Sequence, residues 1–402
     1  MLVLISALAL LSACEVSDVS YEDQHSTVDD ELVSLRSEGR AALKRLIAEG
    51  APQEVIDAVA QQRDASASGL YWETDLAVAR SKARERGIPV LSLRMLGELT
   101  DEYSCANSRF FRTLLYTDPE LARFLDENFV LHWSTERPVP QVQIDFGDGR
   151  VIRTTTTGNS AHYVLDHEGR VLDVLPGLYD AHTFRDRLDD AAQLHAATVD
   201  APRDRDALIA AHHRRAARAI EDRLANVMTP PLRSWMNRSP GRTDDKPVAA
   251  LDAQKFTMSK SMVEVPTLRA LDLDPSFERD SAEDTLRRTL RPVSFSQRAE
   301  RLVRSDRPQR RDESDAEYEA RLAKLLEKAA DNVAMDTALN EARLHYQIHQ
   351  WYIRGDVDGS FETLNERVYT ELFATPSADP WLGLVDDTIY DGLSEFGRPA
   401  RG

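Results

Sequence analysis

Two cysteines, Cys14 and Cys105, carry the most reactive side chains of the sequence, and they lie in different surroundings. Cys105 is the only cysteine after residue 14. A single thiol can form a mixed disulfide with another molecule or be oxidised to a sulfenic acid. It can also be a partly buried residue without redox chemistry, because reactivity depends on exposure and pKa. The residues leave both interpretations open.

Cys14 follows an apolar segment at the start of the chain. Residues 2–13 carry no charge and are too few to span a bilayer as a helix, but they have the length of a signal-peptide apolar region. Leu11-Ser12-Ala13-Cys14 resembles a bacterial lipobox, in which the cysteine is diacylated and becomes the first residue of the mature protein, although no Lys or Arg precedes the apolar run. The sequence therefore predicts an exported protein with a lipid anchor at Cys14, and Glu15 favours the outer membrane, facing the periplasm or the surface.

A pair of histidines one helical turn apart is a second candidate for chemistry. His345 and His349 follow Glu341 at a spacing that can place two imidazoles on one metal ion. The aromatic residues beside them favour a packed helix face instead, namely Tyr346, Trp351 and Tyr352. Because no further ligand is identifiable in the sequence, we expect neither a metal site nor a cofactor.

The segment around Cys105 predicts alternating strands and helices. The mostly apolar run 88–94 is typical of a buried parallel strand, and Asp166-His-Glu-Gly169 supplies the turn of a hairpin. A further hairpin is expected around Gly147-Asp148-Gly149. In chain order the predicted elements are helices 31–50, 52–62 and 75–86, strand 88–94, helices 108–116 and 118–128, strand 129–133, the inserted hairpin 142–154, strands 161–165 and 170–174, and helix 183–197.

This order of elements comes with short motifs. Gly87-Ile88-Pro89-Val90-Leu91 precedes Cys105, Asn128-Phe129-Val130 follows it, and Tyr163-Val164-Leu165-Asp166 comes before Gly169-Arg170-Val171. Together they resemble the thioredoxin superfamily over about residues 70–195, since in that family a strand of this kind precedes the active-site cysteine and a hairpin follows it.

The resemblance implies roles for three residues. It places Cys105 at a helix N-terminus, where backbone N–H groups and the helix dipole favour the thiolate. Ser108 then stands where the family has the second cysteine of its C-x-x-C motif, which excludes an intramolecular dithiol cycle. Ser160 aligns with the family's cis-proline, which lies against the cysteine and holds the substrate backbone. The candidate catalytic residues are therefore Cys105, Ser108 and Ser160.

The length and composition allow more than one domain. The 402 residues are 42% hydrophobic, and 68 acidic residues against 50 basic ones give a net charge of -18, which disfavours nucleic acid as a partner. We expect a lipoprotein signal in 1–14, an acidic tether with short helices in 15–68, an α/β thioredoxin-like domain with a central mixed sheet flanked by helices in 69–197, and a mainly α-helical region in 198–402.

Two hypotheses for the function follow. The first is a membrane-anchored envelope protein that uses Cys105 as a monothiol for disulfide exchange or isomerisation with envelope protein substrates. The second is a degenerate thioredoxin-fold scaffold without catalysis, whose helical C-terminal half binds another envelope protein. The cysteine at the expected helix start favours the first, and the replacements at Ser108 and Ser160 favour the second.

Overall fold

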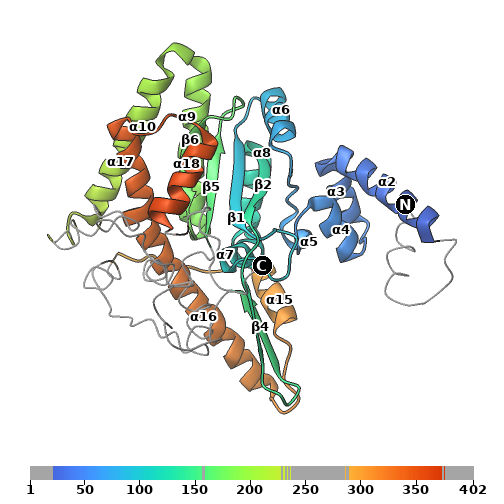
Figure 1. Cartoon of the computed structure of the whole chain (residues 1–402). Helices are drawn as coiled ribbons and strands as arrows, with labels where there is room; N and C mark the ends of the chain where they lie inside the picture. The colour runs from blue at the N-terminus through green and yellow to red at the C-terminus, as the bar shows by residue number, and fades with distance from the viewer. Residues whose placement is uncertain are drawn as a thin grey trace, which may run out of the picture.

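The computed structural model describes residues 21–155, 159–227 and 289–373, with side chains from residue 30 onward, and a few single residues elsewhere: Pro230, Arg233, Met236, Leu286 and Thr375. Figure 1 shows the arrangement of the helices and strands. The predicted signal segment with Cys14 lies outside the described residues, as does much of the predicted helical region beyond residue 227.

The N-terminal helices form a small apolar cluster of their own. The predicted helix 31–50 is wrong in one respect, because the chain forms two helices that meet at Gly39. Gly39 has a φ of 59°, a left-handed conformation that glycine adopts without strain, and the ring of Tyr71 lies 3.5 Å from where a Cβ would be. The helices are α2 (Tyr21–Glu38), α3 (Arg40–Ala48), α4 (Gln53–Ala60) and α5 (Ala65–Ser68).

A mixed four-stranded sheet forms the centre of the molecule, as predicted. Its strands are β1 (Val90–Leu96), β2 (Val130–Arg137), β5 (Ser160–Leu165) and β6 (Val171–Pro176), in the order β2-β1-β5-β6. β1 runs parallel to β2 and antiparallel to β5, and β5 pairs with β6 as the predicted hairpin. β5 and β6 are buried along their whole length, which explains their nearly continuous apolar sequences.

Helices flank this sheet and begin at capping residues. α6 (Leu76–Arg86) packs on β1 and β2, α8 (Pro119–Asn128) on β2, and α9 (Ala181–Asp200) on β5 and β6. Asp75, Asp118 and Asp180 accept backbone N–H bonds at the three N-termini. The predicted helix 108–116 starts two residues earlier as α7 (Ala106–Phe110) and continues as a π-helical turn, η1 (Phe111–Leu115).

The inserted hairpin is present and consists of β3 (Gln141–Asp145) and β4 (Val151–Thr155). It extends away from the four-stranded sheet as a separate two-stranded ribbon (Figure 1). Phe146, Val151 and Ile152 are exposed on it.

The C-terminal helices pack directly on the sheet. Tyr352 and Asn365 bond to Val171 and Tyr163, and apolar side chains of this region belong to the same cluster as the sheet: Val333, Leu344, Ile348, Trp351, Phe361, Leu364, Val368, Tyr369, Leu372 and Phe373. The elements are η2 (Pro202–Asp204), α10 (Arg205–Leu224), α15 (Gln297–Asp306), α16 (Asp315–Leu339), η4 (Asn340–His345), α17 (Tyr346–Arg354), α18 (Phe361–Arg367) and η5 (Val368–Leu372). Residues of α16, η4, α17, α18 and η5 thus share the core of the sheet, and a smaller cluster lies between α10 and α16.

Candidate functional sites

Cys105 lies at the N-terminus of a helix, as the sequence predicts. It is the N-cap residue of α7, and its Sγ accepts a hydrogen bond from the backbone N–H of Ser108 at 3.4 Å. The residue has an exposed fraction of 0% and belongs to the central apolar cluster. The thiol therefore acts as a helix cap inside the protein, without direct contact with solvent.

The structure places Ser108 against Cys105 and joins Ser160 to Asn107 of the same helix. The Ser108 hydroxyl lies 2.8 Å from the carbonyl oxygen of Cys105 and 2.6 Å from the Ser104 hydroxyl. The amide of Asn107 donates to the hydroxyl of Ser160 at 3.1 Å, and the peptide bond before Ser160 is trans. Both serines are buried, so their hydroxyls serve internal hydrogen bonds: that of Ser160 joins β5 to α7, and that of Ser108 stays within residues 104–108.

One arginine lies beside this group. Arg109 donates to the hydroxyl of Thr155 at 3.3 Å. Burial lowers the pKa of Arg109, while the neighbouring Cys105 and Tyr103 act in the opposite direction. The thiol thus belongs to the central apolar cluster and has hydroxyl, amide and guanidinium side chains on the residues next to it.

A second group of chemically active side chains lies around Asp173 on β6. His212 and His213 of α10, His345 at the end of η4 and His349 of α17 all converge on this carboxylate. All five side chains are buried. Potential ligand atoms lie within 4.8 Å of one another in two sets that share Asp173, one with His212 and His213 and one with His345 and His349. We refer to these five residues as the histidine cluster.

The contacts within the histidine cluster fall into two sets, those made by Asp173 and those made by His213. Nε2 of His345 lies 3.0 Å from Oδ1 of Asp173, and Nε2 of His212 lies 3.4 Å from Oδ2. Nδ1 of His213 lies 2.8 Å from Nδ1 of His349, and its Nε2 lies 3.1 Å from the carbonyl oxygen of Leu172. His213 thus joins the backbone of β6 to α17.

The charges in the histidine cluster are set by burial and by its own members. Burial would raise the pKa of Asp173, but His345 and His212 outweigh it and hold this pKa well below its usual range. Burial lowers the pKa of His213 to about 3 and that of His349 well below its usual value. Asp173 is thus ionised, and His213 and His349 are neutral, at neutral pH, and these are the forms in which a carboxylate and an imidazole bind metal ions.

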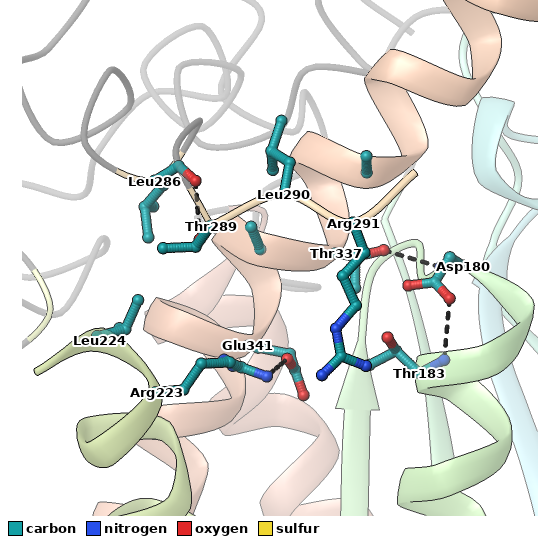
Figure 2. Close-up of a pocket in the computed structure, with 12 residues that line it drawn as sticks. Asp180, Thr183, Arg223, Leu224, Leu286, Thr289, Leu290, Arg291, Thr337 and Glu341 are labelled. Atoms are coloured by element: carbon teal, nitrogen blue, oxygen red, sulfur yellow. Dashed lines mark hydrogen bonds and ion pairs between the residues drawn. The ribbon is translucent and has the colours of Figure 1, made fainter. Parts of the chain in front are cut away.

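Glu341, which the sequence places one turn before His345, does not join the histidine cluster. Its carboxylate pairs with Arg187 at 2.6 Å and with Arg223 at 2.5 Å. Figure 2 shows Glu341 and Arg223 beside Asp180 and Thr337, where α9, α10 and α16 meet. The sequence offered no third ligand for His345 and His349, whereas the structure places Asp173, His212 and His213 beside them.

Two signals in the sequence could have indicated the missing residues. Asp173 is an acidic residue within the otherwise apolar strand 171–176, and His212 and His213 are adjacent in an amphipathic helix. Neither signal identifies the other, because β6, α10 and α17 are far apart in the chain.

A cavity of about 370 Å³ reaches the histidine cluster between α9 and α10. His212 and His349 contribute to its wall, and so do Arg187 and Arg215. The cavity thus borders two of the five residues.

No protein-family model, curated protein or solved structure matches this chain. Among the described residues, no helix combines the length and apolar character that a membrane crossing requires.

Proposed function

We propose that this chain is a lipid-anchored protein of the bacterial envelope in which a thioredoxin-like domain serves as a binding scaffold, with Cys105 in a structural role. The order strand, helix, strand, hairpin, helix in β1, α7 with α8, β2, β5 with β6, and α9 supports the proposed fold. The lipobox-like segment ending at Cys14 supports the anchor.

The burial of Cys105 is the observation that carries the proposal. Disulfide exchange requires the attacking thiolate to approach a sulfur of its substrate, so the reactive atom must be accessible. Cys105 has no exposed surface, and its Sγ already accepts the N–H of Ser108. Ser108 and Ser160 use their hydroxyls within the protein, where the family motif would have a second thiol and a substrate-binding proline.

The β3–β4 hairpin supports a binding role for the scaffold. Its exposed apolar side chains Phe146, Val151 and Ile152 lie on a ribbon outside the main core. Exposed apolar surface of this kind is commonly used in contacts between proteins. The partner we propose is another envelope protein, and the net charge of -18 disfavours nucleic acid.

One observation favours monothiol exchange as a second candidate function. The N–H of Ser108 at 3.4 Å and the nearby Arg109 would both stabilise a thiolate at Cys105. In this alternative, an opening of the surrounding structure would have to expose Sγ before each reaction.

The pH dependence of Cys105 alkylation separates the two candidates. In a Cys14→Ser chain, Cys105 is the only thiol, and iodoacetamide labelling is followed by mass spectrometry with the Cys14→Ser/Cys105→Ser chain as the blank. The scaffold proposal predicts native labelling at least roughly 100-fold slower than in denaturant, since each event waits for local opening. Fast native labelling with an apparent pKa well below about 8.5 would instead establish an activated thiol and overturn the proposal.

A further inference from the structure

The histidine cluster contains more nitrogen atoms than its own hydrogen bonds use. When Nε2–H of His213 donates to Leu172, Nδ1 of His213 is left to accept from Nδ1–H of His349. Nε2 of His349 then has no partner among the described residues. Nδ1 of His345 is in the same situation, because its other ring nitrogen faces Asp173.

These two nitrogens are buried deeply enough for the absence of a partner to matter. His345 and His349 are each 1% exposed. Buried polar atoms in folded proteins almost always have a hydrogen-bond partner or a ligand, so each exception requires an explanation. Both atoms belong to residues of one set of potential ligands, Asp173 with His345 and His349, and in His345 it is the other ring nitrogen, Nε2, that faces Asp173.

We propose that Asp173, His345 and His349 bind one divalent transition-metal ion of the zinc type. Two imidazoles and a carboxylate suit zinc and its neighbours in the first transition row, whereas magnesium and calcium prefer oxygen ligands throughout. The i, i+4 spacing of the two histidines on the continuous run of η4 and α17 places both rings on the side that contacts β6. Three protein ligands leave at least one coordination position for water.

His212 and His213 are positioning residues in this proposal. The ring of His213 is held by Leu172 and stacks on Tyr352 with ring centroids 3.8 Å apart, while its Nδ1 contacts His349. His212 lies beside the second oxygen of Asp173. Contacts of this kind orient ligands and strengthen metal binding without providing the coordinating atoms.

The cavity between α9 and α10 borders the proposed site on one side. It reaches His349, which is a proposed ligand, and His212, which is a positioning residue. The site is separate from Cys105, so a metal ion here would be a property beyond the scaffold function and independent of it.

Metal titration of the full chain tests the proposal. After treatment with a chelator and its removal, Zn²⁺ is titrated calorimetrically, and Co²⁺ is added separately to record its visible absorption. We expect one Zn²⁺ per chain and a Co²⁺ spectrum of nitrogen and oxygen ligation without a thiolate charge-transfer band. Absence of stoichiometric binding by the folded wild-type chain would overturn the proposal.

Substitutions then test the assignment of ligands. Asp173→Asn, His345→Gln and His349→Gln should each weaken Zn²⁺ binding by more than about 100-fold, and His212→Gln by about 10-fold to 100-fold. His182→Gln, at an exposed position of α9, and His132→Gln, at a buried position of β2, are the controls that should bind as the wild type does. Equal binding by the wild type and Asp173→Asn, or loss in His212→Gln but not in His345→Gln and His349→Gln, would contradict the assignment.

Thermal unfolding guards against variants that do not fold. Zn²⁺ should raise the midpoint of the wild-type chain and of His182→Gln, because a ligand that binds only the folded state stabilises it. It should leave folded Asp173→Asn unchanged, with circular dichroism as the check on folding. If Asp173→Asn does not fold, His349→Gln provides the same comparison.

Discussion

The surroundings of Cys105 and of Asp173 are both buried, but they are built from different groups. Around Cys105, neutral hydroxyl and amide groups from neighbouring segments bond to one another, and the thiol caps a helix. Around Asp173, four imidazoles come from two helical segments distant in the chain, and two of their nitrogens have no partner among the described residues. The side chains around Cys105 thus mostly bond to one another, with Oδ1 of Asn107 left without a partner among the described residues, whereas the histidine cluster has two such nitrogens on one set of potential ligands.

Removal of the Asp173 carboxylate should destabilise the fold more than any change at Cys105 or on the projecting hairpin. In the metal-free chain, Asp173→Ala leaves His212 and His345 without their acceptor and should lower the free energy of unfolding by about 3 kcal/mol. Urea denaturation measures the loss. Asp189→Ala, at an exposed position of α9, is the control and should change the free energy of unfolding by less than about 0.5 kcal/mol. A loss as small as that of the control would show that the histidine cluster contributes little to the fold.

Acid should destabilise the fold through His162, a buried histidine that packs on the helical segment after Cys105. Burial lowers the pKa of His162 to about 3, and its ring packs on Phe111 of η1. The unfolded chain takes up this proton near pH 6.5, so folding stability from this group is complete above 6.5 and falls towards pH 3. At pH 5 this histidine should lower the free energy of unfolding by about 2 kcal/mol.

A variant isolates that contribution. His162→Gln can keep the bond to Tyr116 but does not titrate, so its stability should fall by about 2 kcal/mol less than that of the wild type between pH 7 and pH 5. Urea denaturation at the two pH values gives the difference. Parallel losses in the two chains would mean that His162 becomes protonated without cost to the fold.

Loss of the cap at Cys105 should have a smaller effect. Cys105→Ala removes the acceptor of the Ser108 N–H and should cost about 1–2 kcal/mol of unfolding free energy, in the range of lost N-caps. Cys105→Ser retains an acceptor and should cost less. If both substitutions leave the denaturation midpoint unchanged, the capping role is wrong.

Substitutions on the projecting hairpin should have the smallest effect on folding. Ile152→Ser and Val151→Ser change exposed side chains of β4, and each should alter the free energy of unfolding by less than about 0.5 kcal/mol. A larger loss, measured by thermal or urea unfolding, would mean that the hairpin packs on the fold rather than being available to a partner.

Much of the fold around Cys105 is predictable because its signals are local. The turn at Asp166 to Gly169 and the β-rich runs beside it predict the β5–β6 hairpin, and Asp118 followed by Pro119 is typical of the start of α8. The break at Gly39 is not predictable in this way, because the apolar spacing continues through it. The residue has a left-handed φ and lies beside Tyr71, which is 32 residues away in the chain.

The histidine cluster could not be predicted from local signals. His345 and His349 are recognisable as a pair, but their partners lie on β6 and α10, which approach α17 only through tertiary packing. Pairing of Glu341 with Arg187 and Arg223 is likewise a consequence of how α9, α10 and η4 meet. Local signals in the sequence can mark single residues such as Asp173, but they do not show which residues of distant segments meet.

Titration of Zn²⁺ into two variants of the full chain, Cys105→Ala and Asp173→Asn, tests the contrast between the two regions most directly. We predict that Cys105→Ala binds one equivalent of Zn²⁺ with the affinity of the wild type. Asp173→Asn should bind Zn²⁺ more than about 100-fold more weakly. Loss of Zn²⁺ binding in Cys105→Ala together with retained Zn²⁺ binding in Asp173→Asn would contradict this contrast. It would mean that the metal binds at the thiol and not at the histidine cluster.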